Sequence, residues 1–332
     1  MTKVSVAMTT FNGGRYIREQ ISSILDQSRR PDELIICDDG STDDTLQIIE
    51  EYINTSPVSI ALHRNGNRLG YRANFLKAAN LCQYDLIAFS DQDDVWHKNK
   101  IERCVDAFER SDISLWHHNF SIVDENLRTI ESQPRQPFEP GVASLVESDP
   151  RVYGFGFSLV FHRSLLEHSN YWDRSVDFFD PQWPEAHDQW FFGLASALGR
   201  VFYCSESLAL YRQHGSNVAG WHKKQAGLDY ISGLNALHRK RLEAEAKSFF
   251  QRSVLFESIS RDCDRKDLMR VASRYQKMSA FSARRLETIS DRRKASMLTS
   301  IVRLALEGAY QNKAAGGAGV NGLLKDIASV VA

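Results

Sequence analysis

The sequence predicts an α/β fold in which a doubly wound, mainly parallel sheet is followed by a C-terminal helical extension. Two observations lead to this prediction. Strand-like and helix-like segments alternate through the first two-thirds of the chain, which is typical of a parallel sheet covered on both faces. The chain has no proline after Pro184 and no glycine between Leu234 and Glu307, so that stretch is expected to be helical.

Four short apolar segments are the predicted strands, and three helices connect them. In chain order they are strand 4–8, helix 14–28, strand 33–37, helix 41–52, strand 58–62, helix 71–81 and strand 85–89. The first helix places Ile17, Ile21 and Ile24 on one face. The second is expected to open with a capping box at residues 41–44. Later in the chain, 190–198 is a predicted helix and 207–210 a predicted strand.

Composition and charge narrow the class of protein. The chain has 332 residues, 42% hydrophobic, and its 41 Lys and Arg nearly balance 42 Asp and Glu. A uniformly basic nucleic-acid-binding protein is therefore not expected. The charge is uneven, because residues 239–303 hold 17 Lys and Arg against 8 Asp and Glu. Five scattered cysteines without a CxxC pair and a start without a signal-peptide pattern predict a cytoplasmic location.

Polar and acidic side chains follow the predicted strands where each strand ends. They are Thr9, Thr10 and Asn12, then Asp38 and Asp39, then Asp91, Asp93 and Asp94. Ligands of such sheets bind beyond the carboxyl ends of the strands. Crowded carboxylates repel each other unless a cation compensates, and oxygen ligands suit Mg²⁺ or Mn²⁺. The sequence thus predicts a metal that bridges carboxylates to a diphosphate; the alternative is a solvated acidic turn that caps a helix.

Two later clusters could also carry chemistry. Asp188, among aromatic residues, could act as a general base, although an N-cap of the following helix is the alternative. Arg212 could hold phosphate, and His214 could bind metal or phosphate. A single histidine, however, is more often structural.

Taken in order, these motifs resemble glycosyltransferase family 2, the inverting enzymes of GT-A fold. The resemblance is carried by residues 4–12, 38–45, 67–70 with Asn74, and 91–94. Residues 187–190 and 211–220 resemble the rhamnosyltransferase-like branch. The resemblance implies a GT-A catalytic domain at 1–225, with donor binding in 1–110 and acceptor binding in 111–225. The remaining residues, 226–332, form a basic helical extension without an assigned motif.

The resemblance also implies roles for individual residues. Nucleotide contacts would come from Thr9, Asn12, Asp39, Arg68, Arg72, Asp91 and Arg212. Asp39 would contact the base, and Arg72 is a second candidate, beside Arg68, to face the diphosphate. Asp91, Asp93 and Asp94 all remain candidate metal ligands, with His214 as a further one. Asp188 matches the catalytic base.

The implied function is metal-dependent, inverting transfer of a sugar from a nucleoside-diphosphate donor to a glycan or lipid-linked acceptor in surface polysaccharide synthesis. Rhamnose is one candidate sugar. One alternative is a non-catalytic nucleotide-sugar-binding module, which the presence of Asp188 disfavours. Another is a phosphohydrolase of the DxD type, because residues 91–95 fit DxDx[TV]. That family places its nucleophile after the first strand, whereas three strands precede residue 91 here.

The basic extension has two interpretations. Arg292, Arg293 and Lys294 precede a helix whose Met297, Ile301, Leu304 and Ala305 share a face. A basic amphipathic helix is typical of contact with a membrane surface, here the inner face. The alternative, which we favour, is a helix packed on the catalytic domain or in an oligomer interface.

Overall fold

The computed structural model describes residues 2–134, 136, 138–143, 153–178, 180–217, 230–291, 293–311 and 317–331. The chain divides into two compact units. The first takes 1–143, 153–169 and 187–222, and the second takes 144–152, 170–186 and 223–332. The boundary expected at 225 lies outside the described residues, whereas 170–186, expected in the catalytic part, group with the second unit.

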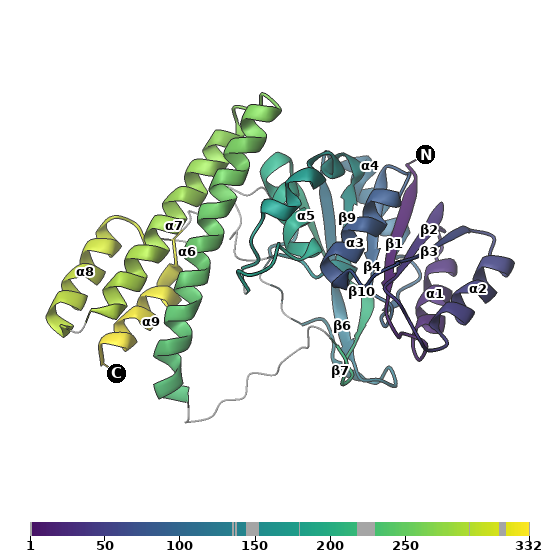
Figure 1. Cartoon of the computed structure of the whole chain (residues 1–332), viewed down its shortest axis with the longest axis horizontal. Helices are drawn as coiled ribbons and strands as arrows, with labels where there is room; N and C mark the ends of the chain where they lie inside the picture. Colours follow the sequence, from purple (N-terminus) through teal and green to yellow (C-terminus); the bar gives the residue numbers. More distant parts are fainter. Residues whose placement is uncertain are drawn as a thin grey trace. The chain divides into compact units, whose positions relative to one another are not determined.

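One sheet forms the centre of the first unit (Figure 1). Its strands in the described part of the chain are β1 (Val4–Thr10), β2 (Glu33–Asp38), β3 (Ser59–Arg64), β4 (Leu86–Ser90), β5 (Val95–Trp96), β6 (Leu115–Val123), β7 (Thr129–Glu131), β8 (Gly141–Ala143), β9 (Leu159–His162) and β10 (Val201–Arg212). The spatial order is β3-β2-β1-β4-β9-β6-β10-β5, with β7 beside β6 and β8 beside β10. The α/β fold predicted from the sequence is confirmed.

Parallel pairing dominates one half of the sheet and mixed pairing the other. Strands β3, β2, β1 and β4 are parallel, as is the pair β6–β10. Strand β9 runs antiparallel between β4 and β6, and β5, β7 and β8 are also antiparallel to their partners. The four predicted strands are therefore the parallel half, and the mixed half lies beyond them.

Helices cover both faces of the sheet. On one face, α1 (Ile17–Leu25), α2 (Thr45–Thr55) and α4 (Lys100–Arg110) bury their apolar sides against β1, β2 and β6. On the other face lie α3 (Gly70–Leu81) and α5 (His187–Leu198). There Phe89 of β4 packs against Phe75 of α3 and Phe191 of α5. Two 3₁₀ segments, η1 (Gly156–Ser158) and η2 (Arg163–Arg174), flank β9.

The capping box predicted for the second helix is wrong. Helix α2 begins at Thr45, and Asp44 makes no side-chain cap hydrogen bond. Instead, the Asp43 carboxylate accepts hydrogen bonds from the backbone N–H groups of Gly14 (3.0 Å) and Thr45 (3.1 Å). These polar residues fix the loop after β1 to the loop after β2, an alternative to capping that short polar side chains offer the backbone.

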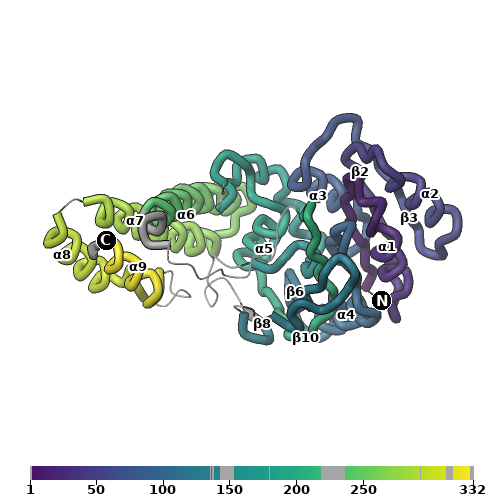
Figure 2. The backbone as a smooth tube through the Cα atoms, turned by 90° about the horizontal axis from the view of Figure 1, so that it is seen from below, coloured from purple at the N-terminus to yellow at the C-terminus, as the bar shows by residue number. Residues whose placement is uncertain are grey.

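The second unit contains α6 (Tyr230–Asp262), α7 (Leu268–Ser290), α8 (Lys294–Leu306) and α9 (Gly319–Val331). Helices α6 and α7 lie side by side in both ribbon views (Figures 1 and 2). The apolar face predicted around Met297 and Ile301 is buried against Leu242 of α6 and Ile289 of α7. That face is therefore packed within the helical unit itself. Arg292, part of the predicted basic run, lies outside the described residues.

Candidate active site

The ends of β1, β2 and β4 lie at one edge of the sheet. In the register Thr10 pairs with Asp38, and Met8 pairs with Ser90. Thr10 Oγ1 donates to the Asp38 carboxylate at 2.8 Å. Residues 38–41 and 91–94 therefore start from neighbouring positions at the same edge. This is the arrangement that the strand-end pattern predicted.

The adjacent residues Asp38 and Asp39 hold two different loops with their side chains. Asp38 holds its own turn by accepting from the N–H groups of Gly40 (3.0 Å) and Ser41 (2.9 Å). Asp39 accepts from the N–H groups of Leu69 (2.7 Å) and Gly70 (2.8 Å). Gly70 has φ +76°, a left-handed conformation that favours glycine, so the start of α3 is built to reach Asp39. The buried Asp39 thus fixes the loop that carries Arg68.

The other predicted donor contacts lie around this edge. Asn12, in a left-handed conformation with φ 49°, accepts from the Thr42 N–H at 2.8 Å. The Arg68 guanidinium lies 3.9 Å from the centre of the Phe11 ring. The Arg72 guanidinium lies 4.8 Å from the centre of the Tyr71 ring and contributes to lowering the pKa of His187. Thr9 is nearly buried in β1. Their contacts with a nucleotide stay predictions.

The acidic turn after β4 concentrates negative charge in a desolvated place. Burial and the neighbouring carboxylates of Asp93 and Asp188 raise the pKa of Asp91 to about 8. Burial, Asp93 and Asp91 also raise the pKa of the fully buried Asp94. Lys100 is buried nearby, and burial lowers its pKa well below the ordinary value. The turn therefore holds more carboxyl groups than its own protein surroundings neutralise.

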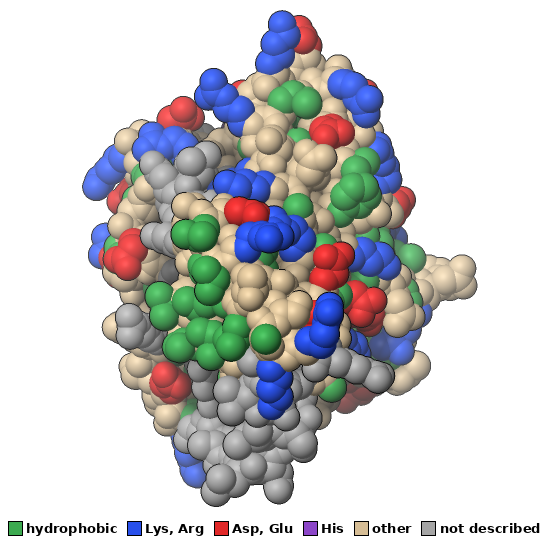
Figure 3. Space-filling view, turned by 90° about the vertical axis from the view of Figure 1, so that its left-hand side faces the viewer, with side chains coloured by type: hydrophobic (Ala, Val, Ile, Leu, Met, Phe, Trp, Pro, Cys, Tyr) green, Lys and Arg blue, Asp and Glu red, His purple; other side chains and the backbone are tan. Residues whose placement is uncertain are grey.

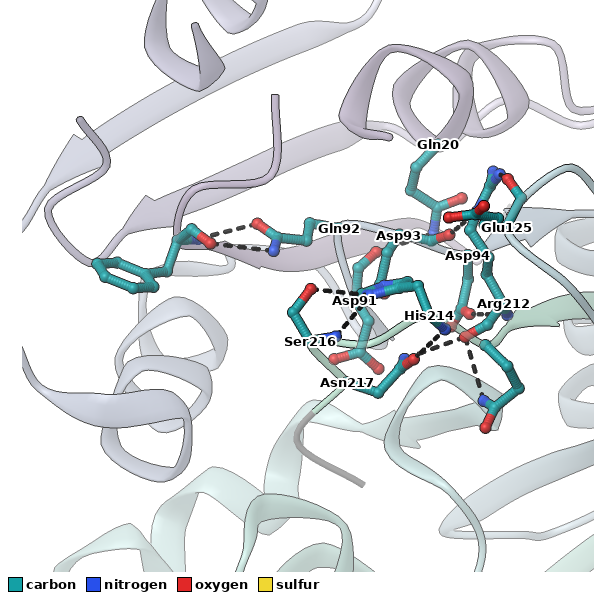
Figure 4. A network of polar contacts seen from close by, with 12 residues as sticks. Gln20, Asp91, Gln92, Asp93, Asp94, Glu125, Arg212, His214, Ser216 and Asn217 are labelled. Carbon is teal, nitrogen blue, oxygen red and sulfur yellow. Dashed lines mark hydrogen bonds and ion pairs between the residues drawn. The ribbon is translucent and has the colours of Figure 1, made fainter. Parts of the chain in front are cut away.

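Two glutamines hold the backbone of this turn. Gln92 accepts from the Phe11 N–H (2.9 Å) and donates to the Phe11 carbonyl (3.1 Å). Gln20 of α1 donates to the Asp91 carbonyl at 3.1 Å and to Ser90 Oγ at 2.8 Å. The Gln92 and Gln20 side-chain amides bond to backbone groups of Phe11 and Asp91 and not to the aspartate carboxylates of the turn (Figure 4).

Arg212, predicted to hold phosphate, is buried, and its side chain and backbone contact residues of the acidic turn. Its side chain is 1% exposed. Nε donates to the Asp93 carbonyl (2.7 Å), Nη1 to the Glu125 carbonyl (2.9 Å), and Nη2 pairs with the Glu19 carboxylate. Its backbone N–H donates to Asp94 Oδ1 at 3.0 Å. Since each guanidinium nitrogen has a protein acceptor, the residue is placed to position the turn, and its contact with phosphate stays a prediction.

His214 lies directly over the turn, as Figure 4 shows. Its Nε2 is 2.8 Å from Asp93 Oδ2, and its ring stacks on Tyr16 with centres 4.7 Å apart. The Ser216 N–H donates to Nδ1 at 3.3 Å. This contact assigns the proton of the neutral ring to Nε2, which then donates to Asp93. The histidine and the carboxylate are thus adjacent, and Nε2 could bind a metal shared with Asp93 only after giving up that proton.

Asp188 lies at the start of α5, near enough to the acidic turn for its charge to affect Asp91. It is the second residue of α5, and its Oδ1 accepts from the Gln189 N–H at 2.8 Å. Because its charge contributes to the raised pKa of Asp91, the two carboxyl groups interact across the edge.

His187 forms the apolar support of Asp188. Its buried ring stacks on Phe75 with centres 3.8 Å apart, and burial lowers its pKa to about 3. A Cβ on Gly156 would lie 2.2 Å from His187 Nε2, so only glycine allows this approach. The neutral ring packs among Phe75, Phe89 and Gly156 and so fixes the start of α5.

The acidic turn fits a divalent cation whose remaining ligands come from a substrate. Asp94 Oδ2 is buried without a hydrogen-bond partner in the described part of the chain. The carboxylate donors of the turn suit Mg²⁺ or Mn²⁺. Within the described residues, no group of three or more His, Cys, Asp or Glu side chains is arranged to hold a metal ion by itself. Diphosphate oxygens would have to complete such a site.

Sequence reasoning missed several residues that support the turn. Gln20 and Lys100 are polar residues on helix faces that are otherwise apolar, next to Ile21 and Ile101. A polar residue within a buried stripe is a usable signal, because it needs a hydrogen-bond partner inside the fold. Tyr16 and Glu19 gave no such signal, since their partners lie almost two hundred residues away.

The family model for Glycosyl transferase family 2 matches residues 5–168. The chain belongs to glycosyltransferase family 2. It is 30% identical to an uncharacterized glycosyltransferase of Nostoc sp., over 65% of this chain and 66% of that protein. It is 38% identical to the dTDP-rhamnosyl transferase RfbG of Shigella flexneri, over 34% of this chain and 40% of that protein. The chain thus spans less than two thirds of each of these relatives.

Solved structures with the same fold include TarS of S. aureus in complex with UDP-GlcNAc. The TM-score is 0.53 at 17% identity, and the match covers 93% of each chain. TarS in complex with UDP gives a TM-score of 0.54 at 16% identity, over 99% of this chain and 89% of that one. The GT-A-type fold with a C-terminal helical region, expected from the sequence, is confirmed.

Proposed function

We propose that this glycosyltransferase moves a sugar from a nucleoside-diphosphate donor to a hydroxyl of a glycan or lipid-linked acceptor, with inversion and with Mg²⁺ or Mn²⁺. The family and the relative named as a dTDP-rhamnosyl transferase support sugar transfer, with rhamnose as one candidate. The structural neighbour that binds UDP-GlcNAc supports a nucleotide-sugar donor. Surface polysaccharide synthesis in the cytoplasm is part of the proposal.

One observation carries the proposal: the charge of Asp188 reaches Asp91 of the acidic turn. A base for the acceptor and a cation site for the donor would then share one sheet edge. A non-catalytic binding module has no need of that carboxylate. The phosphohydrolase alternative loses support, because the acidic turn follows β4 in the described sheet and not its first strand.

Different residues of the site would act on the sugar donor and on the acceptor hydroxyl. Asp91, Asp93, Asp94 and His214 would hold the cation, which when bound would neutralise negative charge on the departing diphosphate. Arg68 and Arg72 would add positive charge beside that group. Asp188 accepts the proton of the acceptor hydroxyl. At the same time the hydroxyl oxygen bonds to the anomeric carbon, and the nucleoside diphosphate leaves from the opposite face of the sugar. One displacement inverts the configuration without an enzyme nucleophile.

A panel of nucleotide sugars tests the proposal. Thermal unfolding is measured with UDP-, dTDP- and GDP-sugars, each with Mn²⁺ and with EDTA. A bound donor at 100 times its Kd adds about 2.7 kcal/mol to stability by mass action. We expect one nucleotide to raise Tm, and more so with Mn²⁺. No rise with any donor would contradict the proposal.

The stabilising donor is then used for product analysis. Transfer to an acceptor with an inverted anomeric proton signal by NMR supports the proposed reaction. If the donor binds but is neither transferred nor hydrolysed, the result would favour the non-catalytic binding module. Phosphate release from simple phosphomonoesters would favour the phosphohydrolase.

A further inference from the structure

Helices α8 and α9 each carry an apolar stripe that faces solvent. Leu298, Val302 and Leu306 follow each other at four-residue spacing on α8. Val320, Leu324 and Ile327 do the same, at spacings of four and three, on α9. These spacings place each set on one helix face. Their exposed fractions run from 38% for Ile327 to 84% for Leu306, so each of these side chains is partly open to solvent among the described residues.

The two stripes differ from the faces that hold the helices in place. On α8, Met297, Ile301 and Leu304 are buried. On α9, Asp326 is buried and Leu323 packs against the same core. Helices α8 and α9 contact each other, and we call their two exposed stripes together the α8–α9 patch. Figure 3 shows hydrophobic side chains gathered on the side of the molecule where α8 lies.

Basic side chains border the α8–α9 patch. Lys294 lies one turn before Leu298, Arg303 follows Val302, and Lys325 follows Leu324. The acidic residues of these helices are occupied elsewhere, since Glu307 pairs with Arg284 and the buried Asp326 pairs with Arg285. The patch therefore presents apolar side chains with a positive border.

We propose that the α8–α9 patch binds an anionic phospholipid bilayer. The apolar stripes would enter the boundary between headgroups and acyl chains, and the Lys and Arg side chains would contact phosphate groups. A second copy of the chain fits less well. A two-fold contact would bring the same lysines and arginines of both copies together around the apolar centre. No described helix is long and apolar enough to cross a membrane, so the contact would lie at the surface.

Vesicle co-sedimentation of the full chain tests this surface. The vesicles contain phosphatidylcholine alone or with about 40% phosphatidylglycerol, an ordinary anionic lipid fraction. We expect binding to the anionic vesicles only, weakened as salt rises. The double variant Leu306→Ser/Leu324→Ser should lower the partition coefficient about tenfold or more, because both side chains lose apolar burial in the interface.

A matched variant separates the patch from general apolar exposure. Met269→Ser changes a residue on α7 that is 47% exposed and lies outside the patch, and it should leave vesicle binding unchanged. Thermal unfolding confirms that all variants fold. No binding to anionic vesicles would overturn the proposal, as would binding that the double variant leaves intact. Sedimentation velocity tests whether a second copy of the chain covers the patch. If the parent chain is a dimer and the double variant is a monomer, the patch is a subunit contact and the proposal is overturned.

Discussion

Buried carboxylates occur in both units of the molecule, but their surroundings have opposite effects. In the helical unit, burial works to raise the pKa of Asp326, yet hydrogen bonds from His238 and Arg285 outweigh it and hold the pKa below its ordinary value. At the acidic turn, burial and neighbouring carboxylates raise the pKa of Asp91 and Asp94. The carboxylate of Asp326 is paired and stabilises the fold. The crowded carboxylates of Asp91 and Asp94 lack such a partner and would be stabilised in their ionised form by a bound cation.

The largest expected effect is on the reaction. Asp188→Asn keeps the size and the hydrogen bond to Gln189 but removes the base. We expect the transfer rate to fall about 10²- to 10⁴-fold, the usual contribution of general-base catalysis. Calorimetric titration should show nearly unchanged nucleotide affinity. The exposed Asp112→Asn is the control, and an equal loss of rate and affinity in Asp188→Asn would show a structural role.

The paired carboxylate should dominate stability. Asp326→Asn leaves Arg285 buried without its anionic partner, and loss of one partner of a buried pair costs about 3 kcal/mol or more. Hydrogen exchange of α6, α7 and α9 amides measures the loss, and Asn321→Ala on the exposed side of α9 is the control. The counterpart Asp94→Asn should keep or raise stability without metal. Equal destabilisation by both variants would remove the distinction between the two regions.

Arg212 tests whether the acidic turn needs to be held in place. Arg212→Met breaks the contacts with the Asp93 and Glu125 carbonyls. Residues behind metal ligands are typically worth about 10- to 100-fold in metal affinity or activity. We expect Mn²⁺ affinity to fall within that range, while Glu19→Gln, which changes only a half-exposed partner, has a smaller effect. Unchanged Mn²⁺ affinity in Arg212→Met would contradict the positioning role.

The smallest expected effect is a pH dependence of the first unit. Burial holds the pKa of His187 at about 3, below its ordinary value of 6.5. Below pH 6.5 the unfolded chain therefore binds a proton that the folded chain does not, so stability falls as pH is lowered. Between pH 7.5 and 5.5 this costs about 1.4 kcal/mol.

Urea unfolding at the two pH values measures this difference. His187→Phe preserves the aromatic stacking and should lose that part of the pH dependence, whereas the exposed His162→Phe should retain it. If His187→Phe shows the full pH dependence of the parent chain, His187 is not the neutral buried group described above.

Local patterns predicted the parallel half of the sheet and the meeting of its polar strand ends. These signals are short-range: an apolar strand followed directly by Asp or Asn is visible in a few residues. Strand β6 was missed, because Leu115–Val123 contains two histidines and an asparagine yet is buried throughout. Strand β9 is only four residues long. In both cases, pairing with distant strands overrides the local pattern.

The role of Arg212 could not be predicted for a similar reason. Its sequence surroundings are polar, which suggests an exposed side chain that binds phosphate. Its burial depends on Glu19, on Tyr16 and on carbonyls of distant loops. Asp188 and His214, by contrast, were predicted from their sequence surroundings as well as from the family resemblance. In the structure His214 contacts Asp93, and the charge of Asp188 contributes to the raised pKa of Asp91, whereas their roles in catalysis and metal binding stay predictions.

A crystal structure with Mn²⁺ and the nucleoside diphosphate of the stabilising donor is the most direct test of the central claim. Anomalous scattering locates the metal independently of any prior assignment. We predict a single strong peak bonded to diphosphate oxygens and to side chains of the 91–94 turn, with Asp188 facing the sugar side of the nucleotide. A nucleotide bound at this edge without metal, or a metal bound away from the turn, would contradict it.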